Sequence, residues 1–223
     1  MIKAALIDMD GVLYDSMPHH AKAWKRLADE MGMPLAEEEF YQYEGMTGED
    51  TINKIALREL GKVFSKEETD RLYARKAKYF QSFGEPRLMP GAADVLEFLK
   101  REGIICVLVT GSGQTSLLGK LATDYPGVFA SDRMVTAKNV GHGKPHPEPY
   151  LKGAALAGVE ISECIAIDNA PLGVESAARA GAFTIGVTTG PIPASMLLEA
   201  GASVVVDSME ACCEFLKKNL PDL

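Results

Sequence analysis

The sequence lacks long hydrophobic runs and has no excess of basic charge. No apolar stretch reaches the roughly 20 residues that a membrane-spanning helix needs, so we expect no membrane partner. Lysine and arginine number 23 against 31 aspartates and glutamates, which gives a net charge of -8. Nucleic acid requires a basic face, so we expect no nucleic-acid partner. A small anionic ligand is compatible with this charge, because a few lysines or a metal ion can reverse the field within one cleft.

Cysteine is also scarce, and the four cysteines show no zinc-binding spacing. Cys106 and Cys164 lie in apolar segments that predict strands, and Cys212 and Cys213 are adjacent on a predicted helix. This distribution is typical of reduced cysteines in a core. Residues 1–7 are too short for a signal peptide. We therefore expect a cytoplasmic protein, and we expect a monomer.

The 223 residues suffice for one α/β core with a small inserted domain. Short apolar runs that predict strands lie at 4–7, 104–110, 164–167, 184–187 and 203–206. Helical periodicity fills several intervals between them, as in the segment from Ala92 that stops at Gly103. This alternation predicts an α/β fold whose mostly parallel sheet is flanked by helices, with ligands at the carboxyl ends of the strands.

One long interval between the first two core strands contains no predicted strand. Its helical stretches lie at 20–32, 48–61 and 66–83. An interval of this length is too long for an ordinary crossover connection, so we interpret it as an inserted all-helical cap. The predicted domains are a core of residues 1–15 and 87–223 and a cap of residues 16–86. Asp15 lies where the chain leaves the core, and we assign it to the hinge.

The first polar cluster, Asp8-Met9-Asp10-Gly11, directly follows the first predicted strand. Residues two apart in an extended segment point the same way, so both carboxylates can face one site. Gly11 permits a sharp exit from the strand. Taken alone, a solvated turn explains the pair equally well. A calcium loop of the EF-hand type is disfavoured, because the later acidic ligands are missing.

The second cluster, Thr110-Gly111-Ser112-Gly113, follows the second strand. Small residues allow close approach of the backbone, and hydroxyls with oriented N–H groups can hold an anion near the start of a helix. Taken alone, an ordinary strand-to-helix turn with a capping hydroxyl is the better explanation.

The third cluster is "GHGKPHPEP" at 141–149. Prolines after Lys144 and His146 keep this segment out of a helix until about Glu148, so Lys144 is a compact positive charge on a rigid loop. His142 and His146 flank the lysine and could indicate a metal. Histidines in loops are more often surface residues, and we assign these two no role.

The fourth cluster, Asp168-Asn169, follows the strand at 164–167. Side-chain oxygens on adjacent residues at a strand end suit Mg²⁺, which prefers oxygen ligands. The alternative is a helix N-cap before Pro171. A parallel sheet brings all four clusters together, and acids for a metal, hydroxyls for an anion and one lysine describe phosphoryl transfer.

The motifs "DMDGVLYDS", "TGS", "GKP" and "DNAPLGV" resemble, in order and spacing, those of the haloacid dehalogenase (HAD) superfamily. The resemblance is to its β-phosphoglucomutase-like branch, which has a Rossmann-like core and a helical cap after the first motif. It spans nearly the whole chain. The segments "TGSGQTSLL", "GKPHPEPYL" and "NAPLGVESA" are most similar to an inorganic pyrophosphatase of that branch from gut Bacteroides.

The resemblance implies that Asp8 is the nucleophile, which forms an aspartyl phosphate, and that Asp10 is the general acid and base. The dehalogenases lack the second aspartate, so carbon–halogen chemistry is disfavoured. Thr110 and the backbone of Gly111 and Ser112 match the phosphate-binding motif. Lys144 matches the lysine that neutralises nucleophile and phosphate.

By the same resemblance, Mg²⁺ would be held by the Asp8 carboxylate, the Asp10 backbone carbonyl and the fourth motif. The usual Glu-Asp pair of that motif reads Asp168-Asn169 here. An amide oxygen can still bind Mg²⁺, but the change implies a lower metal affinity. A phosphate-binding pseudoenzyme therefore stays an alternative.

Cap residues bear on the substrate. In the mutases a cap arginine holds the second phosphate of the substrate, and the matching position here is Gly48, which counts against a mutase. Glu44 is similar to the cap glutamate of the pyrophosphatase and could bind the metal–substrate complex. Lys76 and His20 match polar cap positions of the branch. The alternative for each is a surface charge on a helix.

These inferences predict a Mg²⁺-dependent phosphohydrolase that acts on pyrophosphate or on a small phosphate ester. A sugar-phosphate phosphatase and a β-phosphoglucomutase are the next alternatives. A receiver-like signalling domain also has a phosphorylated aspartate and a lysine on a parallel sheet. The long helical insertion and the close pair of Asp8 and Asp10 argue against a receiver, which needs an exposed acceptor.

Overall fold

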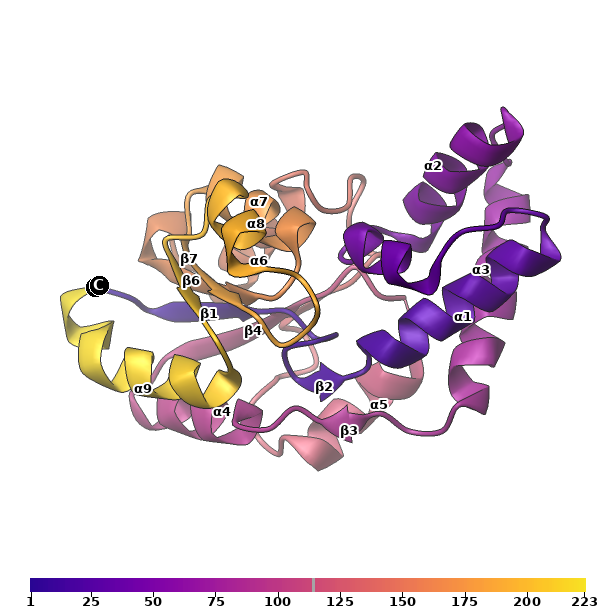
Figure 1. Ribbon diagram of the computed structural model, residues 1–223. Coiled ribbons are helices and arrows are strands. Elements are labelled where there is room, and N and C mark those ends of the chain that lie inside the picture. Colours follow the sequence, from indigo (N-terminus) through magenta and orange to yellow (C-terminus); the bar gives the residue numbers. More distant parts are fainter. Residues whose placement is uncertain (114) are drawn as a thin grey trace.

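The computed structural model describes residues 1–113 and 115–223, and it has a parallel sheet between two layers of helices, with a group of helices at one end (Figure 1). The six strands are all parallel and lie in the order β5-β4-β1-β6-β7-β8. They are β1 (Ala4–Ile7), β4 (Ile105–Val109), β5 (Met134–Val135), β6 (Cys164–Asp168), β7 (Phe183–Val187) and β8 (Val204–Val206). The expected α/β fold class is confirmed. The strand β5 was not predicted from the sequence, because two residues are too few to show a periodicity.

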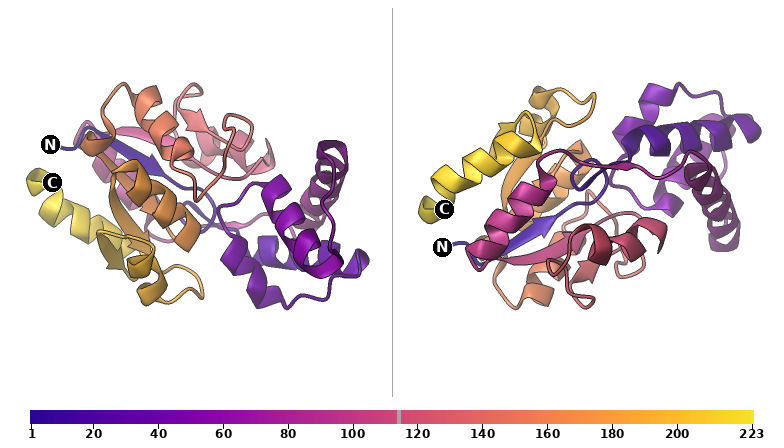
Figure 2. Two further views of the ribbon diagram at one scale, coloured as in Figure 1. Left: turned by 90° about the horizontal axis from the view of Figure 1, so that it is seen from above. Right: turned by 90° about the horizontal axis from the view of Figure 1, so that it is seen from below.

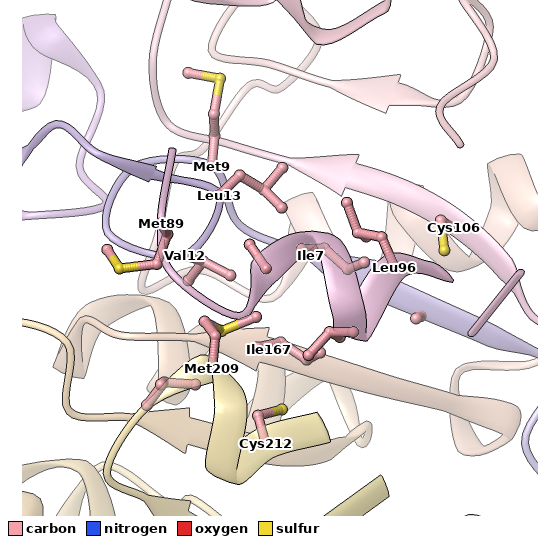
Figure 3. Close-up of a cluster of buried hydrophobic side chains, with 14 of the residues drawn as sticks. Ile7, Met9, Val12, Leu13, Met89, Leu96, Cys106, Ile167, Met209 and Cys212 are labelled. Carbon is pink, nitrogen blue, oxygen red and sulfur yellow. The ribbon is translucent and has the colours of Figure 1, made fainter. Parts of the chain in front are cut away.

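Alternate residues of the strands pack into separate clusters on the two faces of the sheet. Ile7 is in register with Leu108 and Ile167, and all three belong to one cluster. Leu6 belongs to the cluster on the other face. Figure 3 shows the first cluster, in which Ile7 and Ile167 meet side chains of α4 and α9, among them Cys212. All four cysteines are buried and free, as expected.

Helices cover both faces of the sheet. The first face is covered by α4 (Ala92–Arg101), α5 (Thr115–Asp124) and α9 (Met209–Asn219), and the other by α6 (Glu148–Ala157) and α7 (Pro171–Ala180). The shorter helices are η2 (Ile161–Glu163), α8 (Ala194–Glu199) and η3 (Leu220–Asp222). As predicted, α6 begins only after the prolines of its loop, and α7 begins at a proline that suits the first turn. No helix among the described residues is long and apolar enough to cross a membrane.

The cap interval folds into helices around a hydrophobic cluster of its own. These helices are α1 (Met17–Glu30), η1 (Glu37–Tyr43), α2 (Gly48–Leu60) and α3 (Lys66–Ser82). Thr47 caps α2, and a capping box of Ser65 and Glu68 begins α3. The α1 helix begins before the predicted stretch, because Pro18 is tolerated in its first turn. The 3₁₀ helix η1 was not predicted.

Two short strands join the cap to the core. They are β2 (Tyr14–Asp15) and β3 (Arg87–Leu88), and they pair antiparallel, with Asp15 opposite Arg87. All views show the cap helices beyond this connection, to one side of the sheet (Figures 1 and 2). We therefore propose the division into a core of residues 1–15 and 87–223 and a cap of residues 16–86, with Asp15 in the hinge.

Candidate active site

Asp8, Lys144 and Asp168 form a buried ion-pair network at the carboxyl ends of β1 and β6. Lys144 Nζ donates to Asp8 Oδ1 at 2.6 Å and to Asp168 Oδ2 at 2.7 Å. Tyr150 donates its hydroxyl to the same Asp168 oxygen at 2.5 Å, and the Ala170 N–H donates to Asp168 Oδ1 at 3.0 Å. This second bond explains why Asp168, the last residue of β6, is fixed at the start of α7. Lys144 therefore links the first, third and fourth clusters.

Asp10 lies beside this network and contacts the cap. Asp8 is 5% exposed and Asp10 is 8% exposed, so the alternative of a solvated turn is wrong. Asp10 Oδ1 accepts from Ser16 Oγ at 2.6 Å and lies 3.0 Å from His20 Nε2. The other ring nitrogen of His20, Nδ1, contacts Lys76 Nζ. Because a lysine ammonium can only donate, this contact favours the His20 tautomer that carries its proton on Nε2 and donates it to Asp10.

Burial and charge set the protonation preferences of these groups. Burial raises the pKa of Asp8, and the carboxylates of Asp168 and Asp10 raise it further, against the effect of Lys144. Burial opposes the charge on Lys144, but Asp168 and Asp8 overcome it and raise the lysine pKa. Burial lowers the pKa of Lys76 to about 7. The core half of the site thus has more carboxylates than cations, which favours binding of a further positive charge.

The second cluster lies at the end of β4, where the cap closes over it. Thr110 and Ser112 are buried, and the Ser112 N–H donates to Thr110 Oγ1 at 3.0 Å. The Gly113 N–H donates to the Tyr73 hydroxyl at 3.1 Å. A β-carbon at Gly111 would overlap the Gly45 carbonyl of the cap. The glycine is therefore needed for this close approach of core and cap.

Asn169 connects the fourth cluster to the cap. Its Nδ2 donates to Glu44 Oε1 at 2.7 Å. Burial raises the pKa of Glu44, against the effect of this hydrogen bond. Gly11 has a φ of 82°, and a β-carbon there would overlap the Asn169 side chain. The first and fourth clusters therefore pack directly against each other.

A hard cation fits these residues. Asn169 Oδ1 is buried and has no hydrogen-bond partner among the described residues. Asn169 follows Asp168 in the chain, and Lys144 links Asp168 to Asp8, so this part of the site offers buried amide and carboxylate oxygens, the ligands that Mg²⁺ prefers. The side chain of Asn169 does not cap α7, because Ala170 occupies the N-cap position and its N–H donates to Asp168 Oδ1.

The structure brings every site residue expected from the sequence to one pocket and the layer beneath it. Asp8, Asp10, His20, Glu44, Lys76, Thr110, Gly111 and Ser112 line the pocket, and Lys144, Asp168 and Asn169 lie beneath them. Three further residues of the site were not predicted from the sequence: Ser16, Tyr73 and Tyr150. The helical pattern of α3 does not indicate which of its residues faces the core, so it carries no signal for Tyr73.

The Tyr73 ring fills the space beside Gly48. A β-carbon at Gly48 would overlap this ring. Tyr73 packs near Trp24, and Lys76 Nζ lies 4.9 Å from the Trp24 ring and 5.8 Å from the Tyr73 ring. Aromatic faces can stabilise the lysine charge at this distance. The cap therefore closes the pocket with an aromatic wall that holds one buried amine.

A parallel α/β sheet with paired carboxylates at the end of its central strand, an opposing lysine and an inserted helical cap defines a class of hydrolases. The family model of haloacid dehalogenase-like hydrolases matches residues 2–181. The chain belongs to this family and is an enzyme of the hydrolase class.

Two of three similar proteins are described as β-phosphoglucomutases, and the third is a phosphatase. A solved structure from Bacteroides vulgatus, described as a candidate β-phosphoglucomutase, is 42% identical, has a TM-score of 0.93, and is matched over 99% of this chain and 89% of that one. Validoxylamine A 7'-phosphate phosphatase of Streptomyces hygroscopicus is 31% identical over 85% of this chain and 87% of that protein. β-Phosphoglucomutase of Bacillus subtilis is 28% identical over 85% of this chain and 84% of that protein. The branch expected from the motifs is confirmed.

Proposed function

We propose that this protein is a Mg²⁺-dependent phosphohydrolase that forms an aspartyl phosphate on Asp8 and that its preferred substrate is inorganic pyrophosphate. The observation that carries the proposal is the buried network of Asp8, Lys144 and Asp168, next in the chain to Asn169, whose Oδ1 has no partner among the described residues. Together these groups supply a nucleophile, a fixed positive charge and oxygen ligands for a cation.

The proposed reaction has two steps. An Asp8 oxygen attacks phosphorus, the bond to the leaving oxygen breaks, and Asp10 gives that oxygen a proton. Water then attacks the aspartyl phosphate at phosphorus and gives a proton to Asp10, which releases inorganic phosphate and restores the Asp8 carboxylate. Lys144 stabilises the charge of the transferred group from its position 2.6 Å from Asp8.

Protein groups hold the reacting atoms in place. Ser16 and His20 both contact Asp10 Oδ1, which fixes the carboxyl group for proton transfer. The Thr110 hydroxyl accepts from the Ser112 N–H and can donate its own proton to a phosphate oxygen, beside the Gly111 and Ser112 backbone that the resemblance assigns to phosphate binding. Mg²⁺, held by Asp8, the Asp10 carbonyl, Asp168 and Asn169, would supply charge neutralisation for the phosphoryl oxygens.

The pocket favours a compact substrate. Tyr73 fills the space beside Gly48, and both residues line the pocket, so we expect the pocket to accept a sugar ring less readily than a smaller substrate. Position 48 is a glycine, whereas the resemblance leads us to expect an arginine there in a mutase. Lys76 is a buried amine on the cap side, and burial lowers its pKa to about 7. The negative charge of a second phosphate group beside it would favour the charged form of the lysine. Pyrophosphate is small and carries this second group.

Sugar phosphates are the second candidate class. The similarity to validoxylamine A 7'-phosphate phosphatase and to β-phosphoglucomutase favours a phosphatase or phosphomutase of phosphorylated carbohydrates. A rearrangement of the Tyr73 side chain would make room for a sugar. The buried position of Asp8 argues against a receiver-like domain. The Asn169 oxygen, which has no partner in the part of the chain that the structure describes, argues against a pseudoenzyme that has lost its metal.

Phosphate release from a panel of substrates tests the proposal. The panel contains pyrophosphate, glucose 1-phosphate, glucose 6-phosphate and short-chain phosphomonoesters, each with Mg²⁺ and with a chelator. We expect the highest kcat/KM for pyrophosphate, and no turnover without Mg²⁺. Interconversion of the two glucose phosphates would instead support a mutase. Absence of turnover on every member, with phosphate still bound, would support a pseudoenzyme.

A further inference from the structure

A second group of metal-ligand side chains lies outside the proposed active site. His142 and His146 flank Lys144 on its loop, and Glu148 is the first residue of α6. One ligand atom from each of the three side chains lies within 4.8 Å of the other two. Both histidines are exposed, and neither takes part in the proposed phosphoryl transfer.

The Glu148 carboxylate is held in place by its own partners. Its Oε1 accepts from the Gly141 N–H and from Lys152 Nζ, both at 2.8 Å. Its Oε2 accepts from the His142 N–H at 2.9 Å and lies 3.2 Å from His142 Nδ1. Carboxylates that bind metals are oriented by such outer hydrogen bonds. Glu148 can therefore direct one oxygen at an ion while the other keeps its bonds.

The two imidazole rings face each other beside this carboxylate. Their centroids are 4.7 Å apart, with an angle of 30° between the rings. His146 Nδ1 accepts from the Glu148 N–H at 3.2 Å. That N–H lies in the first turn of α6, where it has no acceptor within the helix. When an ion binds His146 Nδ1, the N–H can therefore donate to water instead. Both Nδ1 atoms thus lie beside Glu148.

We propose that His142, His146 and Glu148 form a second metal site, which binds a divalent transition-metal ion of the Zn²⁺ type. Imidazole nitrogen suits zinc, nickel and copper, whereas Mg²⁺ prefers oxygen, so the two sites select different ions. Zinc bonds of about 2.0–2.2 Å in a tetrahedron place ligand atoms roughly 3.3 Å apart. Exposed histidines can rotate to close the remaining gap, and water completes the coordination.

This site would constrain the loop that supplies Lys144. The ion would join both ends of the segment 142–146 to the start of α6. The same loop touches the cap, since a β-carbon at Gly143 would lie 2.6 Å from Thr47 Cγ2. The ion therefore slows the opening of this loop, which amide hydrogen exchange measures directly.

Calorimetric titration of the full chain with ZnCl₂, in saturating Mg²⁺, tests the site. We expect the double variant His142→Ala/His146→Ala to bind one Zn²⁺ ion fewer, or to bind it with an affinity reduced by about tenfold or more. The loss of a residue that only orients a metal ligand already reduces metal affinity by about this factor. His19→Ala removes a histidine outside the cluster and should bind Zn²⁺ like the wild type. Both replaced side chains are exposed, so the double variant should fold. Equal Zn²⁺ binding by wild type and double variant would overturn the proposal.

Two spectroscopic readouts identify the ligands and the loop effect. The electron paramagnetic resonance spectrum of one bound Cu²⁺ should show coupling to imidazole nitrogen in the wild type and lose it in the double variant. Coupling that persists in the double variant, or a spectrum with oxygen ligands alone, contradicts the site. Zn²⁺ should slow amide exchange at 141–146 in the wild type only, and an equal change in the double variant contradicts the loop effect.

Discussion

The core and the cap build their halves of the site in different ways. Core side chains such as Asp8, Thr110 and Asp168 stand at or next to the ends of parallel strands, where sheet register fixes them. His20 and Lys76 come from separate cap helices and reach the site only because the cap is docked. We infer that the core supplies the reaction, while the cap positions Asp10 and selects the substrate. Variants of the two halves should therefore fail in different ways.

The largest effect is expected in the core, at Asp8. Asp8→Asn removes the proposed nucleophile and should lower kcat by roughly 10⁴-fold or more, as the loss of a nucleophile does elsewhere. Phosphate release under saturating Mg²⁺ measures it. Asp15→Asn is the matched control, because Asp15 is exposed in the hinge strand. Retained activity in Asp8→Asn would refute the nucleophile assignment, and an equal loss in both variants would indicate a structural defect.

A smaller effect is expected where the cap positions a core residue. His20→Ala removes the cap contact to Asp10 Oδ1, 3.0 Å away, and should lower kcat by about 10²-fold, the lower end of general acid–base contributions. His20→Gln keeps an N–H donor and should lose less. The decrease in kcat of His20→Ala should be smaller for an aryl phosphate, because its leaving group needs no proton. Equal losses on both substrates would contradict a role through Asp10.

The contact between core and cap should show a still smaller effect, on substrate binding. Asn169→Asp removes the amide that donates to Glu44 and puts a second carboxyl group against it, and should raise KM about tenfold, or ~1.4 kcal/mol. Glu44→Gln in the same chain restores a donor and an acceptor, so the double variant should recover most of this loss. Steady-state kinetics at saturating Mg²⁺ measure it. Failure of the double variant to recover would mean that Asn169 acts through the metal alone.

This contrast also explains what could be predicted from sequence. Asp8, Thr110 and Asn169 follow apolar runs, and the rule for parallel sheets places such residues together. Tyr73 and Ser16 gave no such signal, because the angle at which a helix docks depends on the packing of the whole cap. The two-residue β5 was too short to detect. A role for His142 and His146 could not be predicted from the sequence, because their rings come together only when the loop is folded.

The smallest effect is expected at Tyr73. Tyr73→Phe keeps the ring beside Gly48 but removes the acceptor for the Gly113 N–H, a loss of about 0.5–1.5 kcal/mol. This bond exists only in the closed arrangement of cap and core, so KM should rise a few-fold while kcat stays near wild type. Tyr73→Ala additionally opens the space beside Gly48, and should raise the kcat/KM for glucose phosphates relative to pyrophosphate. If Tyr73→Ala left the substrate ranking unchanged, the aromatic wall would not select the substrate, and selection would then rest on Glu44 and Lys76.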